Sequence, residues 1–173
     1  MNGLPGLQHA QQQGWGLTEA LCVLALSAIG AVWGLSSWQT GLQKARVQSA
    51  REGFVHSLQW VRIQAIAQGA DMLLVRATDC TGVSSASDWR CGWRVTTMDG
   101  KTMAMHRLPE GVAMVHNLRT DKLKINRRGE PGTVGDSFVF RPLSDPRSQM
   151  ATTVCISAAG RVRFQAGDKC SSP

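Results

Sequence analysis

The chain has 173 residues, enough for one ordinary globular domain and one additional element, which excludes a large multidomain enzyme. Hydrophobic residues make up 43% and charged residues 18%, so the composition excludes both a disordered charged tail and a multi-span membrane protein. With 19 Lys and Arg against 12 Asp and Glu, the formal net charge of +7 favours polyanionic partners such as nucleic acid or acidic lipid.

The N-terminal part of the chain has two contrasting segments. Residues 1–14 are polar, rich in Gln and Gly, and without Lys, Arg, Asp or Glu. Residues 17–38 form an apolar run of about 22 residues, which is long enough for a helix to cross a bilayer. Trp15, Trp33 and Trp38 suit the interfacial positions of such a span. We therefore expect a membrane helix; the alternative, a cleaved secretory signal, normally has a shorter apolar region that follows positive charges.

The helical pattern continues through residues 39–68. Apolar residues recur there at steps of three and four, with polar and charged residues between them, as in an amphipathic helix that lies on a domain. Gly69 suits a C-terminal cap, so we expect one helix from Glu19 to Gln68, roughly 75 Å long. The recurring apolar residues are Val47, Ala50, Phe54, Leu58, Val61 and Ala65.

From residue 69 to residue 173 the pattern changes to short apolar or alternating segments, separated by turn residues such as those at 99–100 and 159–160. These segments predict a small, largely antiparallel β domain, so the expected fold class is α+β. The predicted strands are 72–77, 91–97, 102–108, 112–118, 123–126, 137–141, 152–157 and 161–165.

Four of the five cysteines lie beyond the apolar run, and none of them has the CxxC spacing of a zinc or redox site. Two disulfides in an oxidising compartment are the favoured interpretation, and four reduced, buried thiols are the alternative. Of the three possible pairings, Cys80 with Cys91 and Cys155 with Cys170 close the shortest loops and lose the least chain entropy. Each would stabilise the domain by about 3 kcal/mol in the chain-entropy model.

Two features of the sequence predict opposite orientations across a membrane. Lys44, Arg46 and Arg51 follow the apolar run, and the positive-inside rule alone would leave the C-terminal domain in the cytoplasm. Disulfides would instead require the oxidising side of the membrane. We give the cysteines more weight, because a leader without charges carries little topological information.

Glu19 is an acidic residue at the start of the apolar run. A carboxylate in hydrocarbon is costly unless it is paired, which makes Glu19 a candidate functional residue; at headgroup depth the cost would be small. The segment 14–19, GWGLTE, resembles the leader junction of type IV pilins and pseudopilins. The resemblance implies that a prepilin peptidase removes the leader, residues 1–14, after Gly14, and that Trp15 becomes the first, methylated residue.

In that family the glutamate pairs with the N-terminal amine of a neighbouring subunit during filament assembly. The resemblance assigns these roles to Glu19 and to the amine of Trp15, a charge pair that would offset much of the desolvation cost. The leader departs from the family pattern in having no Lys or Arg before Gly14.

The rest of the chain resembles, more narrowly, the FimT and GspH group of minor pilins and pseudopilins. The resemblance implies the type IV pilin-like fold, in which a long N-terminal helix, transmembrane in its first half, packs on a mostly antiparallel β-sheet domain. The residues that carry it are Arg62, Ala65, Ile66, Leu73, Leu74, Val75, Cys80, Trp89, Cys91, Gly92, Trp93, Val154, Cys155, Ile156, Ser157, Gly160, Arg161, Val162, Arg163 and Cys170.

The segment Gly160-Arg161-Val162-Arg163 has a physical interpretation of its own. In an extended strand Arg161 and Arg163 project from the same face, after a turn that Gly160 permits. Two parallel guanidinium groups can hold successive phosphates through bidentate hydrogen bonds. In the FimT branch this motif is associated with DNA binding during natural transformation; the alternative is a solvated edge strand whose arginines discourage aggregation.

A second basic group lies within ten residues of sequence, opposed locally only by Asp121. If it lies beside Arg161 and Arg163, several phosphates could be neutralised together, giving sequence-independent, salt-sensitive binding. The alternative is a soluble, highly charged loop. Trp89 and Trp93 could stack on bases, but core positions are favoured. The second basic group consists of Arg119, Lys122, Lys124, Arg127 and Arg128.

Catalytic and metal-binding motifs are not found in the sequence. The four histidines have no neighbouring Cys, Asp or Glu at metal-ligand spacing, and there is no nucleophile elbow, Walker loop or dinucleotide fingerprint. We therefore expect no enzymatic activity, no metal, no cofactor and no small-molecule substrate. The histidines are His9, His56, His106 and His116. His56 is expected on the polar side of the helix, and His106 and His116 are expected at surface or hydrogen-bonded positions.

The favoured hypothesis is a minor type IV pilin that binds DNA through a basic face. It would sit in the bacterial inner membrane by a single pass, with the C-terminal domain in the periplasm, and then enter a filament. Its partners would be other pilin subunits, the prepilin peptidase, the membrane and DNA. The first alternative is a GspH-like structural pseudopilin of a type II secretion system, and the second is a membrane-tethered basic domain without a filament role.

Overall fold

The computed structural model describes residues 16–83, 85–132 and 135–170, with the side chains of 31–37 excepted. The predicted leader and cleavage site, residues 1–14 with Gly14 and Trp15, lie outside this range, as does the side chain of Trp33. The helix α1 extends over Leu17–Gln68. The chain divides into two compact units, Met1–Thr40 and Gly41–Pro173, and the boundary falls inside α1.

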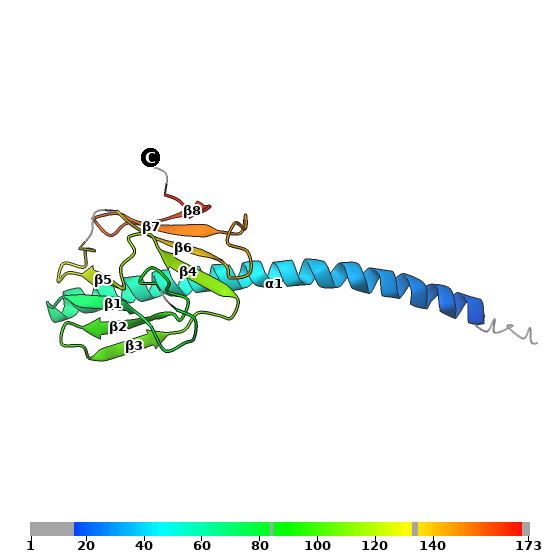
Figure 1. Ribbon diagram of the computed structural model, residues 1–173, viewed down its shortest axis with the longest axis horizontal. Coiled ribbons are helices and arrows are strands. Elements are labelled where there is room, and N and C mark those ends of the chain that lie inside the picture. Colours follow the sequence, from blue (N-terminus) through cyan, green and yellow to red (C-terminus); the bar gives the residue numbers. More distant parts are fainter. Residues whose placement is uncertain (1–15, 84, 133–134, 171–173) are drawn as a thin grey trace, which may run out of the picture. The chain divides into compact units, whose positions relative to one another are not determined.

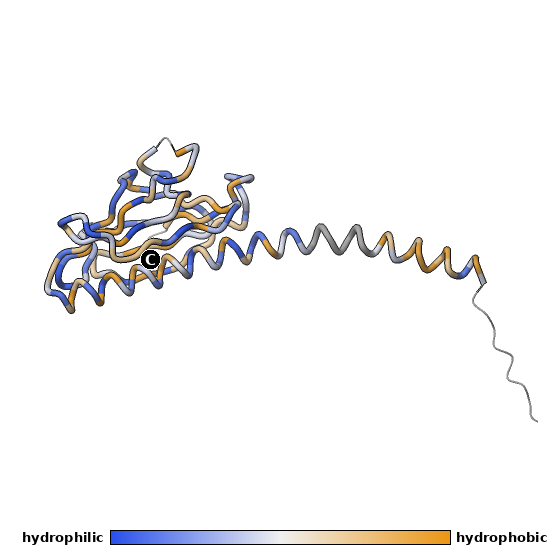
Figure 2. Tube along the Cα trace, turned by 90° about the horizontal axis from the view of Figure 1, so that it is seen from below, coloured by the Kyte–Doolittle hydropathy of each residue, from blue (hydrophilic) through white to orange (hydrophobic). Residues whose placement is uncertain are grey.

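The N-terminal unit contains the first turns of α1. The helix starts with the N–H groups of Glu19 and Ala20 donating to the Gly16 carbonyl at 3.0 and 3.1 Å. Figure 2 shows mostly apolar residues along these turns. Within the described part of the chain, however, no helical stretch combines the length and the mean hydropathy that a membrane span requires. The predicted span at residues 17–38 is therefore not confirmed. Exposed apolar residues here are Leu17, Leu21, Val23, Leu24, Leu26 and Ile29.

In the C-terminal unit, α1 buries one face against the β-sheets. All six apolar residues predicted to recur on this face are less than 5% exposed, from Val47 to Ala65. The helix ends at Gln68 in a Schellman motif, in which Gly69 N–H donates to the Ile66 carbonyl and Ala70 N–H to the Ala65 carbonyl, both at 3.2 Å. Gly69 has φ of 60°, which glycine adopts without strain. The predicted amphipathic helix and its cap are confirmed.

In the described residues, eight strands follow the helix, and each corresponds to one predicted segment. All of these ladders are antiparallel, as predicted, and the strands form two four-stranded sheets, β3-β2-β1-β5 and β4-β6-β7-β8 (Figure 1). The chain is therefore α+β, as predicted. The strands are β1 Met72–Arg76, β2 Trp93–Thr97, β3 Thr102–His106, β4 Val112–His116, β5 Lys122–Ile125, β6 Asp136–Pro142, β7 Thr152–Ile156 and β8 Val162–Ala166.

Phe54 of α1 connects the helix to both sheets. Its ring is fully buried and lies 5.3 Å from the Trp93 ring of β2, 4.5 Å from the Phe138 ring of β6 and 5.7 Å from the Phe140 ring. Trp89 is also fully buried, and Trp93 is 2% exposed. Stacking of these two tryptophans on nucleic-acid bases is therefore excluded, and the expected core positions are confirmed.

Both expected disulfides are present. Cys80 pairs with Cys91 and Cys155 with Cys170, with Cα–Cα distances of 5.6 and 6.0 Å. The first closes the loop before β2, and the second attaches the C-terminal segment to β7. Cys22 of α1 is a free, exposed thiol.

Candidate functional site

The turn between β7 and β8 presents the first of the two motif arginines. Gly160 adopts φ of 74°, and its N–H donates to the Ser157 carbonyl at 2.7 Å. The Ser157 N–H donates in turn to the Arg161 carbonyl at 2.9 Å. The predicted role of Gly160 in a tight turn is confirmed. Arg161 itself belongs to this turn, because β8 starts at Val162 and not at residue 161 as predicted.

Arg163 lies on the outer face of β8. In the β7–β8 ladder it is opposite Cys155, while Val162 is opposite the buried Ile156. Directly opposite residues of an antiparallel pair share a face, so Val162 faces the core and Arg163 faces outward. Both motif arginines are exposed.

A surface hollow of about 600 Å³ lies where this turn meets α1. The motif arginines share it with Arg62 of the helix, a residue that is part of the family resemblance but for which the sequence predicts no role. None of the residues that line it carries a carboxylate, so the charge around the hollow is positive. Its lining consists of Gln59, Arg62, Ser157, Ala159, Gly160, Arg161, Val162 and Arg163.

Lys122 and Lys124 project from the outer face of β5, as the alternation predicts, because Leu123 and Ile125 between and after them are buried. Lys124 is engaged in an ion pair: its Nζ lies 2.7 Å from Asp71 Oδ2. This hydrogen bond, with a second from the Arg127 N–H, lowers the pKa of Asp71 below its ordinary value. The pair is therefore present at neutral pH and is lost only as the pH falls through that lowered pKa.

The turn after β5 holds Arg127 and Arg128 at the surface. The Asn126 side-chain oxygen accepts hydrogen bonds from the N–H groups of Arg128 and Glu130 at 2.9 and 3.0 Å, and Gly129 N–H donates to the Asn126 carbonyl at 2.8 Å. An Asx turn of this kind leaves both arginine side chains exposed.

The second basic group is divided by the fold. Arg119, Lys122 and Lys124 line a separate hollow of about 430 Å³. The turn with Arg127 and Arg128 is instead connected to the motif turn, because Arg62 donates from Nε to the Gly129 carbonyl at 2.6 Å and from Nη1 to the Gly160 carbonyl at 2.7 Å. The turn with Arg127 and Arg128 is therefore the part of the second basic group that lies near the motif turn, and the lysines of β5 are not.

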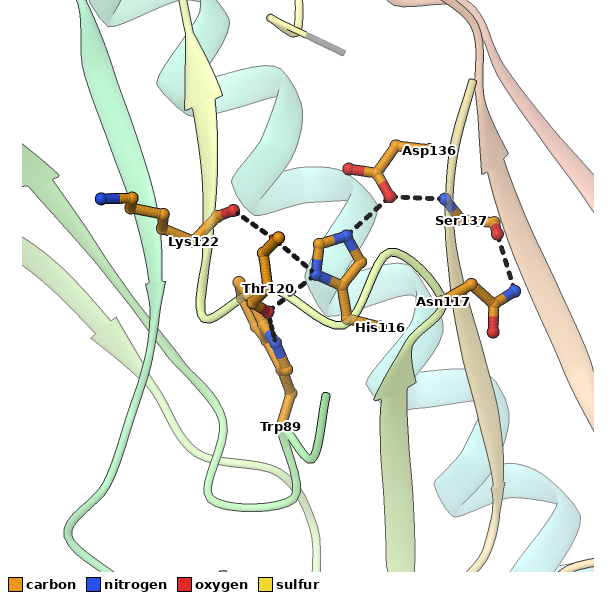
Figure 3. Close-up of polar contacts among 7 residues, drawn as sticks. All are labelled: Trp89, His116, Asn117, Thr120, Lys122, Asp136 and Ser137. Carbon is orange, nitrogen blue, oxygen red and sulfur yellow. Dashed lines mark hydrogen bonds and ion pairs between the residues drawn. The ribbon is translucent and has the colours of Figure 1, made fainter. Parts of the chain in front are cut away.

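The most buried polar cluster of the described residues joins β4 to β6 (Figure 3). His116 Nε2 lies 2.6 Å from Asp136 Oδ1, and both side chains are 1% exposed. His116 Nδ1 lies 2.9 Å from the Thr120 carbonyl, which also accepts a hydrogen bond from Trp89 Nε1 at 3.0 Å. The His116 ring stacks on Phe138. A surface or hydrogen-bonded position was expected for His116. Its partner Asp136 was not predicted, because no local spacing in the sequence connects residues 116 and 136.

The buried His116–Asp136 cluster stabilises the packing of β4 on β6, and its side chains are not accessible to a ligand. The described residues contain no group of three or more His, Cys, Asp or Glu that could hold a metal ion. Glu19, the predicted assembly residue, lies exposed in the first turn of α1.

A family model described as type II transport protein GspH matches residues 50–160. A search of curated proteins gave no match. Among solved structures, the type IV minor pilin FimU of Pseudomonas aeruginosa superposes with a TM-score of 0.60 at 18% identity, covering 75% of this chain and 98% of that chain. The minor pseudopilin EpsH of the type 2 secretion system of Vibrio cholerae superposes with a TM-score of 0.50 at 18% identity, covering 72% and 96%.

The superpositions, at these identities, show a shared fold: a long N-terminal helix packed on antiparallel sheets. The family match covers more than half of the sequence, from α1 to the turn that presents the motif arginines. The chain therefore belongs to the GspH family, within the type IV pilin and pseudopilin superfamily, and has the type IV pilin-like fold.

Proposed function

We propose that this protein is a minor pilin that enters a type IV pilus and binds DNA without sequence specificity, in support of DNA uptake during natural transformation. The observation that carries the proposal is the hollow lined by Arg62, Arg161 and Arg163 without any carboxylate. A guanidinium group is permanently charged and matches phosphate oxygens in a bidentate arrangement. Contacts to the phosphate backbone do not distinguish sequences.

Additional basic residues extend this surface. Arg127 and Arg128 are on the turn that Arg62 connects to the motif turn. Lys122 and Lys124 lie outside the arginine-lined hollow, on the adjoining strand β5, and Asp71 joins Lys124 to the Arg127 turn by pairing with Lys124 Nζ and accepting from the Arg127 N–H. Each cation that neutralises a phosphate releases a counterion, so affinity would fall steeply with added salt.

The test is a salt titration of DNA binding, measured by fluorescence anisotropy with the full chain in mild detergent. The double variant Arg161→Ala/Arg163→Ala is expected to weaken binding and to reduce the slope of log affinity against log salt by about 2. The control, Lys101→Ala/Arg107→Ala, removes the same charge at exposed positions next to β3, on the other sheet, and should leave the slope unchanged. Equal effects of the two variants would contradict a specific DNA-binding face.

Asp71→Asn is a matched variant with the opposite expected effect. It removes the carboxylate that pairs with Lys124, so the ammonium becomes available to a phosphate and the salt slope should increase by up to about 1. An unchanged slope would mean that Lys124 lies outside the DNA contact.

A structural pseudopilin of a type II secretion system is the second candidate function, favoured by the GspH match over residues 50–160. It requires no nucleic-acid contact. A wild-type chain that does not bind DNA even at low salt would favour this alternative.

For assembly, we propose that the leader is cleaved after Gly14 and that Glu19 pairs with the amine of Trp15 in a neighbouring subunit, with the N-terminal helix held first in the inner membrane. The two disulfides support a periplasmic location for the C-terminal unit, because they form in oxidising compartments. N-terminal sequencing of the protein from cells should give Trp15 as the first residue. The Glu19→Ala variant should still be cleaved, but it should no longer be recovered in sheared filaments. A start at Met1 would contradict the proposal.

A further inference from the structure

Arg62 makes two long-range hydrogen bonds to the backbone. Its Nε donates to the Gly129 carbonyl at 2.6 Å, 67 residues along the chain, and its Nη1 donates to the Gly160 carbonyl at 2.7 Å, 98 residues along. The two carbonyls belong to the turns that present Arg127 and Arg128 and, respectively, Arg161. The distance between the two carbonyls is therefore limited to the span of one guanidinium group and its two hydrogen bonds.

Both turns are shaped to approach the helix closely. Gly129 and Gly160 have φ of 75° and 74°. A Cβ at Gly160 would lie 2.8 Å from Arg62 Cζ, and one at Gly129 would lie 2.8 Å from Ile66 Cδ1. The positive φ favours glycine at both positions. At Gly160 a side chain would also displace the hydrogen-bonded guanidinium of Arg62, whereas at Gly129 the exposed side chain of Ile66 can move aside.

Strand pairing does not hold these turns together. The first turn follows β5, which pairs with β1 in one sheet, and the second precedes β8, which pairs with β7 in the other sheet. Arg62 supplies a direct link between them. A planar guanidinium with several donors in fixed directions can bind two carbonyls at once, whereas a lysine has a single ammonium at the end of a flexible stem.

We propose that Arg62 is a positioning residue that holds the two basic turns at a fixed separation, so that their arginines act together on one DNA strand. This inference rests on the proposed DNA binding. Arg62 itself would be occupied by the two carbonyls, and the phosphates would be bound by the exposed arginines of the turns. Two linked groups of contacts give a higher affinity than either alone only when their geometry allows simultaneous binding.

The test compares wild-type chain with Arg62→Lys, which keeps the charge and most of the aliphatic stem. Hydrogen exchange at the Gly129 and Gly160 amides, followed by mass spectrometry, should become faster in the variant. The affinity for an oligonucleotide long enough to reach both turns should fall by about tenfold, because simultaneous binding is lost. The affinity for a thymidine trinucleotide, which reaches one turn, should not change.

Arg62→Gln is the second variant, and thermal unfolding checks that each variant is folded. Arg46→Gln, an exposed position on the same helix, is the control for the loss of one charge. Unchanged exchange in both Arg62 variants would overturn the inference, and so would equal losses of affinity for the long and short oligonucleotides, which would indicate a direct phosphate contact. If wild-type chain binds no DNA, the proposed function fails, and the exchange data alone decide whether Arg62 holds the turns.

Discussion

Replacing Phe54 by Ala is expected to lower the free energy of unfolding by about 3–5 kcal/mol, the typical cost of removing a fully buried phenyl ring. The ring is 0% exposed and contacts aromatic rings of β2 and β6, which belong to different sheets. Its loss would leave a cavity where the helix and both sheets meet, and neighbouring backbone that is already hydrogen-bonded in ladders cannot move in to fill it.

Denaturant unfolding of the full chain, followed by the fluorescence of the buried Trp89 and Trp93, measures this loss. His56→Ala is the control, since His56 is exposed two residues further along the helix. It should change stability by no more than about 0.5 kcal/mol. Similar losses in the two variants would contradict a dominant contribution from the packing of Phe54, because Ala has a higher helix propensity than either residue and cannot destabilise α1 through propensity.

Replacing Asp136 by Ala is expected to lower the free energy of unfolding by about 3 kcal/mol, because buried donors would be left without an acceptor. Asp136 Oδ1 lies 2.6 Å from His116 Nε2 and accepts a hydrogen bond from the Ser137 N–H at 2.7 Å. The loss should also loosen the connection between β4 and β5, because the His116 ring contacts the carbonyl and the hydroxyl oxygen of Thr120 in that connection. Faster hydrogen exchange at residues 117–121 would report this.

Asn117→Ala is the matched control for Asp136. The Asn117 amide donates to the Ser137 hydroxyl at 2.7 Å, on the same strand as Asp136 but at the exposed surface (Figure 3). Water can replace this hydrogen bond, so the expected loss is below about 1 kcal/mol. Equal losses in the two variants would contradict the view that burial, and not the number of hydrogen bonds, determines the contribution of the His116 cluster.

Substitutions at Arg62 and in the two basic turns are expected to have different effects on local order and on DNA binding. The arginine that would organise DNA binding is itself half-buried, and its two backbone acceptors come from distant parts of the chain. Variants of Arg62 are therefore expected to change local order before they change global stability, whereas variants of the exposed arginines should change binding alone.

The elements that depend on local chemistry can be predicted from the amino-acid sequence. The steps of three and four from Val47 to Ala65 predicted the buried face of α1, and Gly69 predicted its end, because periodicity and capping act within one or two turns. Alternation and turn residues predicted each of the eight strands. The two disulfides followed from loop length, since the pairings that lose the least chain entropy are those present.

The tertiary structure alone decided how these elements combine. It divided the strands between two sheets, separated the lysines of β5 from the motif arginines, and joined the two arginine turns through Arg62. It also paired His116 with Asp136 across two strands. The contacts of His116 with Asp136 and of Arg62 with the two turns join residues 20 to 98 positions apart. Such contacts arise from the packing of the whole chain and leave no local pattern in the sequence.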